Sequence, residues 1–301
     1  MQDEVVYDTR YGRFALSSLH EGKFAARFAR GDYWQGNDIA LLSTLVDETS
    51  VVVDVGAHIG TTSIPLARLV KTVLAFEPVA ETRAYLEKNI ALNNISNIIV
   101  YTVAVGEAQG TGTIGLMKEG TVGSYSVLSP EMVPEGETES VHLSTLDAEI
   151  KHVDLLKTDT EGFELQVLRG AKGLIERSRP VIFFEVFLPR LRQHGASASD
   201  LKRFLSMHGY RFYVPLADHM QGQGQVLGRV FSLELVAYLL FPRALFGGAM
   251  EAFDILAIPK EKKSPLKIRS AAYVLALLFV YDLWKGFRVL AHTLGRAAGV
   301  V

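Results

Sequence analysis

The stretch Val51-Val-Val-Asp-Val-Gly-Ala-His-Ile-Gly-Thr-Thr62 decides how the rest of this chain is interpreted. It begins with a β-branched run that holds one acidic residue, Asp54, and continues through two glycines, Gly56 and Gly60, into a segment of helical character. A buried strand, a glycine turn and a helix N-terminus are the parts from which α/β proteins build a nucleotide site. The next apolar run ends at Glu77, 23 residues after Asp54. About 20 residues is the usual separation for a carboxylate that binds ribose hydroxyls.

Apolar runs and helical patterns alternate on both sides of this stretch. The pattern predicts strands at 51–55, 72–76, 98–103, 153–158 and 181–186, with helices at 61–70, 80–92, 163–177 and 198–208. Such alternation predicts βαβ units and a mostly parallel sheet with helices on both faces. The glycine-punctuated piece 106–140 is predicted to leave that sheet, and 210–214 and 253–258 to form a final strand pair.

Composition limits the class of protein. A chain of 301 residues with 49% hydrophobic residues can build one well-packed domain with additions. It has no cysteine, which excludes disulfides, thiolate metal ligands and a cysteine nucleophile. A net charge of −2 gives no reason to expect nucleic acid as a partner. The first residues lack the basic and apolar regions of a signal peptide, so we expect a cytoplasmic protein.

The predicted organisation has three parts: a lead-in segment, 1–49, a main domain, 50–260, and a tail, 261–301. Eight basic and two acidic residues lie in 260–301, so this end carries a formal charge of +6 and the remainder −8. The tail joins an apolar run to a helix with one polar face. It is interpreted as a helix held at an anionic membrane, as a homodimer contact, or as a helix packed on the core. Within the main domain, 216–251 is an insertion, in which a Gly-Gln stretch, 220–228, is expected to be flexible and is followed by an apolar segment, 230–246.

The glycine spacing bears on which nucleotide binds. NAD, FAD and S-adenosylmethionine all present an anionic group and a ribose to such a turn. A dinucleotide turn reads G-x-G-x-x-G, whereas here Val55 stands where the pairing glycine is expected. The lysine of a P-loop is also missing from the turn. The spacing therefore disfavours a dinucleotide. Asp54 is expected either to brace the turn or to reach the amine of a methionine moiety.

Five motifs follow one another along residues 50–260. They are, in order, Asp54-Val-Gly-Ala-His-Ile-Gly60, Ala75-Phe-Glu-Pro78, Leu86-Glu-Lys-Asn-Ile-Ala-Leu-Asn93, Thr145-Leu-Asp147, and Leu156-Lys-Thr-Asp-Thr-Glu-Gly-Phe-Glu164 with Val167-Leu-Arg-Gly-Ala171. In kind and order they resemble the FkbM family of S-adenosylmethionine-dependent methyltransferases. The resemblance implies a class I Rossmann-like fold with a mostly parallel seven-stranded sheet, and S-adenosyl-L-methionine as cofactor.

The resemblance also implies where the donor binds. Gly56 and Gly60 would line its methionine end, Glu77 its ribose, and Val103 with Ala104 its adenine. The remaining expected donor-site residues belong to the same turns and are Asp54, His58 and Pro78. His58 stands where the family commonly has Asn, and Thr158 where it commonly has Ile.

The acceptor side is predicted from three carboxylates, Asp159, Glu161 and Glu185, which follow or end adjacent strands. Ligands bind at that edge of such sheets, and a carboxylate there could take the proton of an acceptor hydroxyl. The structural alternative is a capping box in which Thr158 and Glu161 begin the next helix, with Asp159 helping to cap it. No His-x-x-His spacing supports a metal, so no metal site is predicted.

The characterised members that the chain resembles are O-methyltransferases of sugar or polyketide hydroxyls. The function expected is therefore O-methyl transfer to a hydroxyl, of a sugar or glycan, with a lipid-linked glycan as one option if the tail binds the inner membrane face. The apolar part of the insertion would wall the acceptor pocket or form a buried lid. The alternative is a non-catalytic nucleotide-fold protein that serves as a membrane or assembly module.

Overall fold

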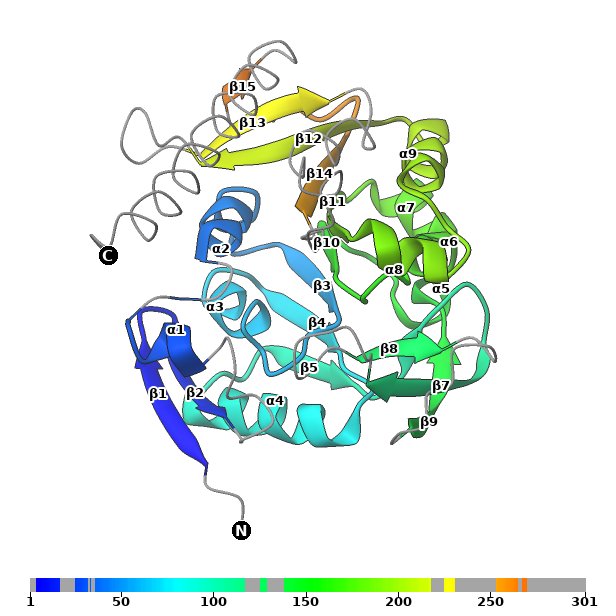
Figure 1. The fold of residues 1–301 in the computed structure, drawn as a ribbon. Helices are drawn as coiled ribbons and strands as arrows, with labels where there is room; N and C mark the ends of the chain where they lie inside the picture. The colour runs from blue at the N-terminus through cyan, green and yellow to red at the C-terminus, as the bar shows by residue number, and fades with distance from the viewer. Residues whose placement is uncertain are drawn as a thin grey trace, which may run out of the picture.

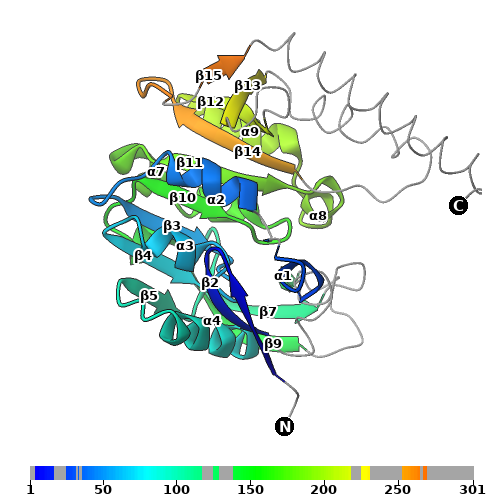
Figure 2. The same ribbon diagram turned by 90° about the vertical axis from the view of Figure 1, so that its left-hand side faces the viewer.

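The computed structural model describes residues 4–16, 25–31, 33, 36–116, 125–128, 138–217, 225–230, 253–264 and 267–269. Within these ranges the chain is built around one nine-stranded sheet, in the order β15-β13-β12-β14-β11-β10-β3-β4-β5. Figure 2 shows these strands side by side from β5 to β15. Their bounds are β3 Val51–Val55, β4 Thr72–Phe76, β5 Ile98–Tyr101, β10 Leu155–Thr158, β11 Val181–Val186, β12 Tyr210–Ala217, β13 Gln225–Val230, β14 Phe253–Pro259 and β15 Lys267–Arg269.

The predicted βαβ alternation is confirmed by the pairing. Strands β5, β4, β3, β10 and β11 are parallel neighbours, and β14 lies antiparallel between β11 and β12. The seven strands from β12 to β5 form the expected sheet. Two further strands, β13 and β15, extend it beyond the prediction. All five parallel strands therefore present their carboxyl ends along one edge, where ligands bind in open α/β sheets.

The insertion 216–251 is corrected in part. Its Gly-Gln stretch was expected to be flexible, but Gln225–Val230 is strand β13 and pairs antiparallel with β12 from Phe212↔Val230 to Ala217↔Gln225. Residues 225–230 form a strand because their backbone pairs with β12, and their glycine-containing sequence does not predict this strand. The apolar residues 231–246 and the tail residues 271–301 lie outside the described residues. The division into lead-in, main domain and tail stays a prediction.

Helices cover both faces of the sheet, with α2 and α3 on one side and α6, α7 and α9 on the other (Figure 1). On the first face, Leu41 and Leu66 pack with sheet residues such as Val52 and Phe183. On the second, Leu165 and Leu201 pack with the alternate positions. The helices are α2 Gly36–Ser43, α3 Ser63–Ala67, α4 Ala80–Leu92, α5 Leu146–Glu149, α6 Glu164–Arg169, α7 Lys172–Ser178, α8 Leu188–Gln193 and α9 Ala198–Met207.

The single helix predicted at 163–177 is two helices, α6 and α7. The break falls at Gly170, which passes so close to another segment that a Cβ there would lie 1.9 Å from the Gly106 carbonyl oxygen. The backbone of Gly170 also accepts a hydrogen bond from the Asp147 amide at 3.0 Å. Contacts with a distant loop therefore end α6, and helical periodicity alone does not reveal them.

Two smaller units flank the sheet. The glycine-punctuated piece leaves it as predicted and forms a four-stranded sheet in the order β6-β9-β7-β8, with bounds Ala104–Val105, Thr138–Ser144, Gly110–Leu116 and Tyr125–Leu128. The lead-in begins with a hairpin of β1 (Val5–Thr9) and β2 (Gly12–Leu16), followed by the short helix α1 (Ala26–Phe28). Asn89 of α4 binds this hairpin by accepting from the Ala15 amide at 2.7 Å. In the described part of the chain, none of the helices has the length and apolar character needed to span a bilayer.

Candidate functional site

The turn after β3 is shaped by its two glycines. Gly56 and Gly60 have φ of 80° and 93°, a region in which residues with a Cβ are strained. The amides of Gly56 and Ala57 donate to the Phe76 carbonyl at 3.1 and 3.0 Å, which ties the turn to the end of β4. A Cβ on Gly56 would lie 2.0 Å from the Asp159 carbonyl oxygen, so glycine is needed for the close approach of the loop after β10.

Asp54 lies beneath this turn and is fully buried. Its Oδ2 accepts a hydrogen bond from the Ser63 hydroxyl at 2.7 Å, and Lys157 Nζ lies 3.0 Å from its Oδ1. Both carboxylate oxygens therefore contact the protein itself. These contacts agree with a bracing role for Asp54, and its contact with the amine of a methionine moiety stays a prediction.

Glu77 follows β4 and faces the glycine turn. Its Oε2 accepts from the His58 amide at 2.9 Å, and its Oε1 accepts from the Val79 amide at 3.0 Å. Burial raises the pKa of Glu77 to about 7, against the opposing effect of these two hydrogen bonds. A carboxylate has about four lone-pair positions, so two acceptor positions remain for a ligand diol. The residues present thus fit a ribose beside the turn.

The other expected donor residues lie around Glu77. His58 is at the centre of the turn with a φ of 51°, and only its amide is needed for the contact with Glu77. The Pro78 carbonyl accepts from Arg83 Nη1 at 2.8 Å, which fixes the start of α4. Ala104 packs in one cluster with Val79, next to Pro78, whereas Val103 is half-buried against the main core. The segment expected to contact adenine therefore adjoins the segment expected to contact ribose.

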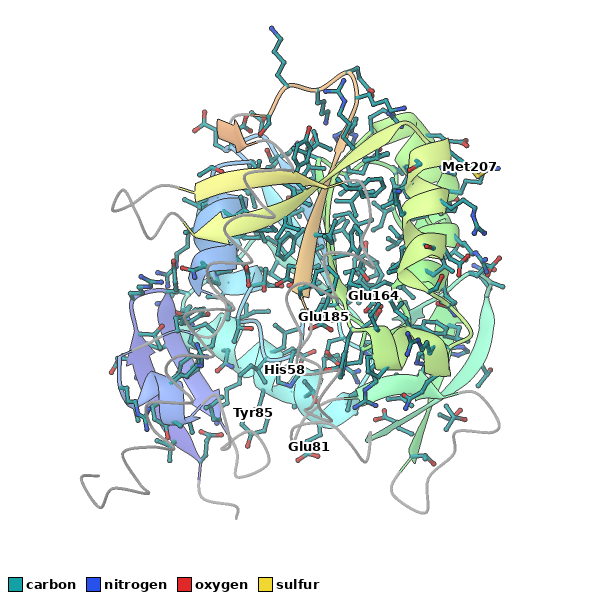
Figure 3. All side chains as sticks on the ribbon, turned by 45° about the horizontal axis from the view of Figure 1, so that its top comes forward. His58, Glu81, Tyr85, Glu164, Glu185 and Met207 are labelled. Carbon is teal, nitrogen blue, oxygen red and sulfur yellow. The ribbon has the colours of Figure 1, made fainter. Side chains whose placement is uncertain are left out.

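The acceptor-side carboxylates come from the loop after β10 and from the end of β11. The side chains of Asp159 and Glu161 are each 26% exposed. Asp159 Oδ2 lies 3.6 Å from Lys157 Nζ, and Glu161 Oε2 lies 4.0 Å from Arg190 Nε. Glu185 is the penultimate residue of β11, and in the view of Figure 3 its label lies between those of Glu164 and His58.

The three predicted carboxylates interact electrostatically. Burial raises the pKa of Glu185 well above its usual range, and the negative charges of Asp159, Glu161 and Asp254 raise it further. The negative charge of Asp159 is one of those that act on Glu185, and the carboxylate of Asp159 lies beside the ammonium group of Lys157. A carboxyl whose pKa is raised in this way is suited to donate a proton or a hydrogen bond.

The capping box considered for Thr158 and Glu161 is wrong. Helix α6 begins at Glu164, and Glu161 has a left-handed φ of 56° before Gly162 at 100°. The loop is held instead by Glu164, whose Oε1 accepts from the Thr160 amide at 2.9 Å, the Thr160 hydroxyl at 3.1 Å and the Gly162 amide at 3.2 Å. Glu164 therefore shapes the loop that presents Asp159 and Glu161.

Three charged residues that the sequence did not single out adjoin this edge. Lys157 contacts both Asp54 and Asp159. Asp254 of β14 is the register partner of Glu185. Asp38 of α2 has its pKa raised to about 7, first by burial and then by the charge of Asp159. Lys157 stands within a quoted motif, but Asp38 and Asp254 are brought in by long-range packing that leaves no local signal. Among the residues described, no group of three or more His, Asp or Glu side chains is placed to hold a metal ion.

Comparison with known proteins gives one family and several distant relatives. The model of the methyltransferase FkbM domain matches residues 54–212. Methyltransferase 1 of Beauveria bassiana is 27% identical over 146 residues, which are 41% of this chain and 59% of that protein. The chain thus spans less than two thirds of this relative.

Solved structures with a similar fold include an FkbM methyltransferase from Methylobacillus flagellatus. It is 20% identical, the match covers 56% of this chain and 40% of that one, and the TM-score is 0.41. TYW2 of M. jannaschii, solved in complex with AdoMet, is 16% identical over 85% of this chain and 86% of its own, with a TM-score of 0.42. Because the family model spans more than half of the sequence, the chain belongs to the FkbM methyltransferase domain family, and its cofactor is S-adenosylmethionine.

Proposed function

We propose that the protein transfers a methyl group from S-adenosylmethionine to a hydroxyl of a sugar or glycan acceptor. The observation that carries this proposal is the contact between Gly56 and the backbone of Asp159. It joins the turn that is expected to hold the methionine end of the donor to the loop that bears the acceptor-side carboxylates. Donor and acceptor groups would therefore meet at one point of the sheet edge.

Methyl transfer needs an electrophilic methyl group, which S-adenosylmethionine supplies on a sulfonium, and an acceptor oxygen that loses its proton. Asp159 would take that proton, because its partly exposed carboxylate lies next to the donor turn. The raised pKa of Glu185 favours the protonated carboxyl, and in that form it would donate a hydrogen bond to the acceptor. Orientation of the two substrates would supply much of the remaining rate enhancement.

A polyhydroxylated acceptor agrees with the polar groups at this edge. Glu185, Asp254 and Asp38 are carboxyl groups from three different elements, and vicinal hydroxyls can both donate to and accept from such groups. Glu161 would add a further acceptor on the loop. The basic tail adds the proposal that the acceptor is an amphiphile, such as a lipid-linked glycan, which the protein reaches at an anionic membrane. In the alternative, the tail binds a second subunit of the same chain.

The test is S-adenosylhomocysteine formation by the full chain against a panel of free glycans, nucleotide sugars and lipid-linked glycans. We expect turnover with at least one carbohydrate, a large but measurable reduction of kcat in Asp159→Asn, and a smaller reduction in Glu185→Gln. Arg203→Gln on the outer side of α9 is a matched surface control. Binding of S-adenosylmethionine without any turnover across the panel would favour the non-catalytic alternative. Methylation of an amine or carbon in place of a hydroxyl would overturn O-methyl transfer.

A further inference from the structure

Lys157 is a buried cation in the middle of the site, and the proposed reaction gives it no role. It lies on β10, is 4% exposed, and is the register partner of Asp54 on β3. Its Nζ lies 3.0 Å from Asp54 Oδ1, 3.4 Å from the Gly56 carbonyl oxygen and 3.6 Å from Asp159 Oδ2. Burial would lower the pKa of Lys157, but the charges of Asp54 and Asp159 outweigh burial and raise it.

The three oxygens around Lys157 belong to two different parts of the site. Asp54 and Gly56 are part of the donor turn, whereas Asp159 belongs to the acceptor-side loop. The backbone continues this link, because the Asp159 amide donates to the Val55 carbonyl at 3.0 Å. The backbone contact fixes the main chain of Asp159 and leaves the direction of its carboxylate to side-chain interactions. A fixed cation between the two parts restricts that direction by attracting the carboxylate toward the donor turn.

We propose that Lys157 is a positioning residue, whose ammonium group holds the carboxylate of Asp159 against the donor turn so that the base is aimed where the methyl group is presented. The inference rests on the proposed function, since it takes Asp159 as the proton acceptor. It goes further by assigning a role in the acceptor half of the reaction to a residue that the donor motif does not include.

A purely structural role for Lys157 makes a different prediction. In that case its task would be to neutralise buried Asp54, which also accepts from the Ser63 hydroxyl on its other side. Substitutions of Lys157 and of Ser63 would then weaken donor binding in the same way. Both variants would have the same turnover at saturating substrate. A positioning role separates the two residues, because Lys157 contacts Asp159 at 3.6 Å whereas the Ser63 hydroxyl donates to Asp54.

The experiment compares Lys157→Met with Ser63→Ala in the full chain. Calorimetry gives the affinity for S-adenosylhomocysteine, and initial rates at saturating donor and acceptor give kcat. We expect Lys157→Met to lower kcat by about 100-fold, as misplacement of a catalytic group does. Ser63→Ala should weaken S-adenosylhomocysteine binding by about fivefold, the effect of one hydrogen bond, with little change in kcat. Lys157→Arg, which keeps the charge, should recover most of the lost turnover.

Two further variants keep the test decisive. Lys157→Met leaves Asp54 buried without its cation, so the double variant Lys157→Met/Asp54→Asn removes both charges if the single variant does not fold. Adding Lys157→Met to Asp159→Asn should cost no further kcat, because the group it positions is already gone. An equal loss in both backgrounds, or unchanged kcat in folded Lys157→Met, overturns the positioning role alone. Full turnover by Asp159→Asn overturns the base assignment and the positioning role with it.

Discussion

Gly56 and Asp159 are in backbone contact across the carboxyl edge of the sheet. A Cβ on Gly56 would lie 2.0 Å from the Asp159 carbonyl oxygen and 3.0 Å from its carbonyl carbon. The two residues come from loops more than 100 positions apart that follow the neighbouring strands β3 and β10. This contact fixes the distance between the donor turn and the loop that bears the proposed base.

Replacing Gly56 by alanine should therefore damage both folding and donor binding. The added Cβ clashes with a backbone oxygen, which cannot move aside, and a left-handed φ costs alanine about 1–2 kcal/mol on its own. We expect a lower melting temperature and at least a tenfold loss of S-adenosylhomocysteine affinity, about 1.4 kcal/mol. Gly110→Ala is the matched control, because a Cβ there meets no atom within 4 Å. Equal behaviour of the two variants would contradict the role given to the contact.

Glu77 should make donor affinity depend on pH. Ribose hydroxyls donate to the ionised carboxylate, so binding is favoured when Glu77 is charged. With a pKa of about 7, affinity should rise with pH up to about 7 and level off above it. Calorimetric titrations with S-adenosylhomocysteine from acidic to mildly alkaline pH measure this profile. Glu77→Gln should flatten it, and a slope that persists in Glu77→Gln would assign the titration to another carboxyl.

The same carboxyl should affect the stability of the ligand-free protein with the opposite sign. Its pKa rises from 4.5 to about 7 in the folded chain, so the folded state holds the proton more tightly than the unfolded state does. The stabilisation is complete below pH 4.5 and is lost as pH rises toward 7.

Glu77→Ala should abolish S-adenosylmethionine binding without unfolding the protein, although unpairing the His58 and Val79 amides should cost about 1–3 kcal/mol each. Circular dichroism and calorimetry on this variant separate the two effects.

An element of the fold could be predicted where the residues that determine it are neighbours in the sequence. The apolar runs that became β3, β4 and β11 are buried on both sides, so composition and length alone marked them. Strand β13 lacks such a run and exists through its pairing with β12. The break between α6 and α7 was also missed, because it is imposed by the Gly106 carbonyl from a distant loop.

The candidate site divides in the same way. Spacing along β3 and β4 was enough to mark Gly56 and Glu77, since both follow strands that the sequence marks clearly. Asp38 and Asp254 come from elements at opposite ends of the chain, and only the packing of α2 and the register of β14 bring them to the edge. The role of Glu164 was hidden because its partners depend on the left-handed conformation of Glu161.

The tail provides a prediction that depends on sequence alone, since residues 271–301 lie outside the described residues. Its excess of basic residues and its one-sided polar pattern predict binding to anionic lipid. We expect the full chain to sediment with vesicles that contain phosphatidylserine and not with neutral vesicles. A chain that ends near Lys260 should stay in the supernatant. If it sediments as the full chain does, the tail is not the anchor, and analytical ultracentrifugation of both chains then tests the dimer alternative.

Glu164 should control the acceptor loop without touching either substrate. Its Oε1 gathers three donors from Thr160 and Gly162, and burial raises its pKa to about 7. Glu164→Ala removes these hydrogen bonds in a buried place and should lower the free energy of unfolding by about 3 kcal/mol. Turnover should fall further than S-adenosylhomocysteine affinity, because the loop bears Asp159 whereas Glu77 lies on another strand end. Glu87→Ala on the exposed side of α4 is the control for loss of a helical glutamate. If turnover and affinity fall together in Glu164→Ala, the loop serves the donor side as well, and the separation of roles along the sheet edge is wrong.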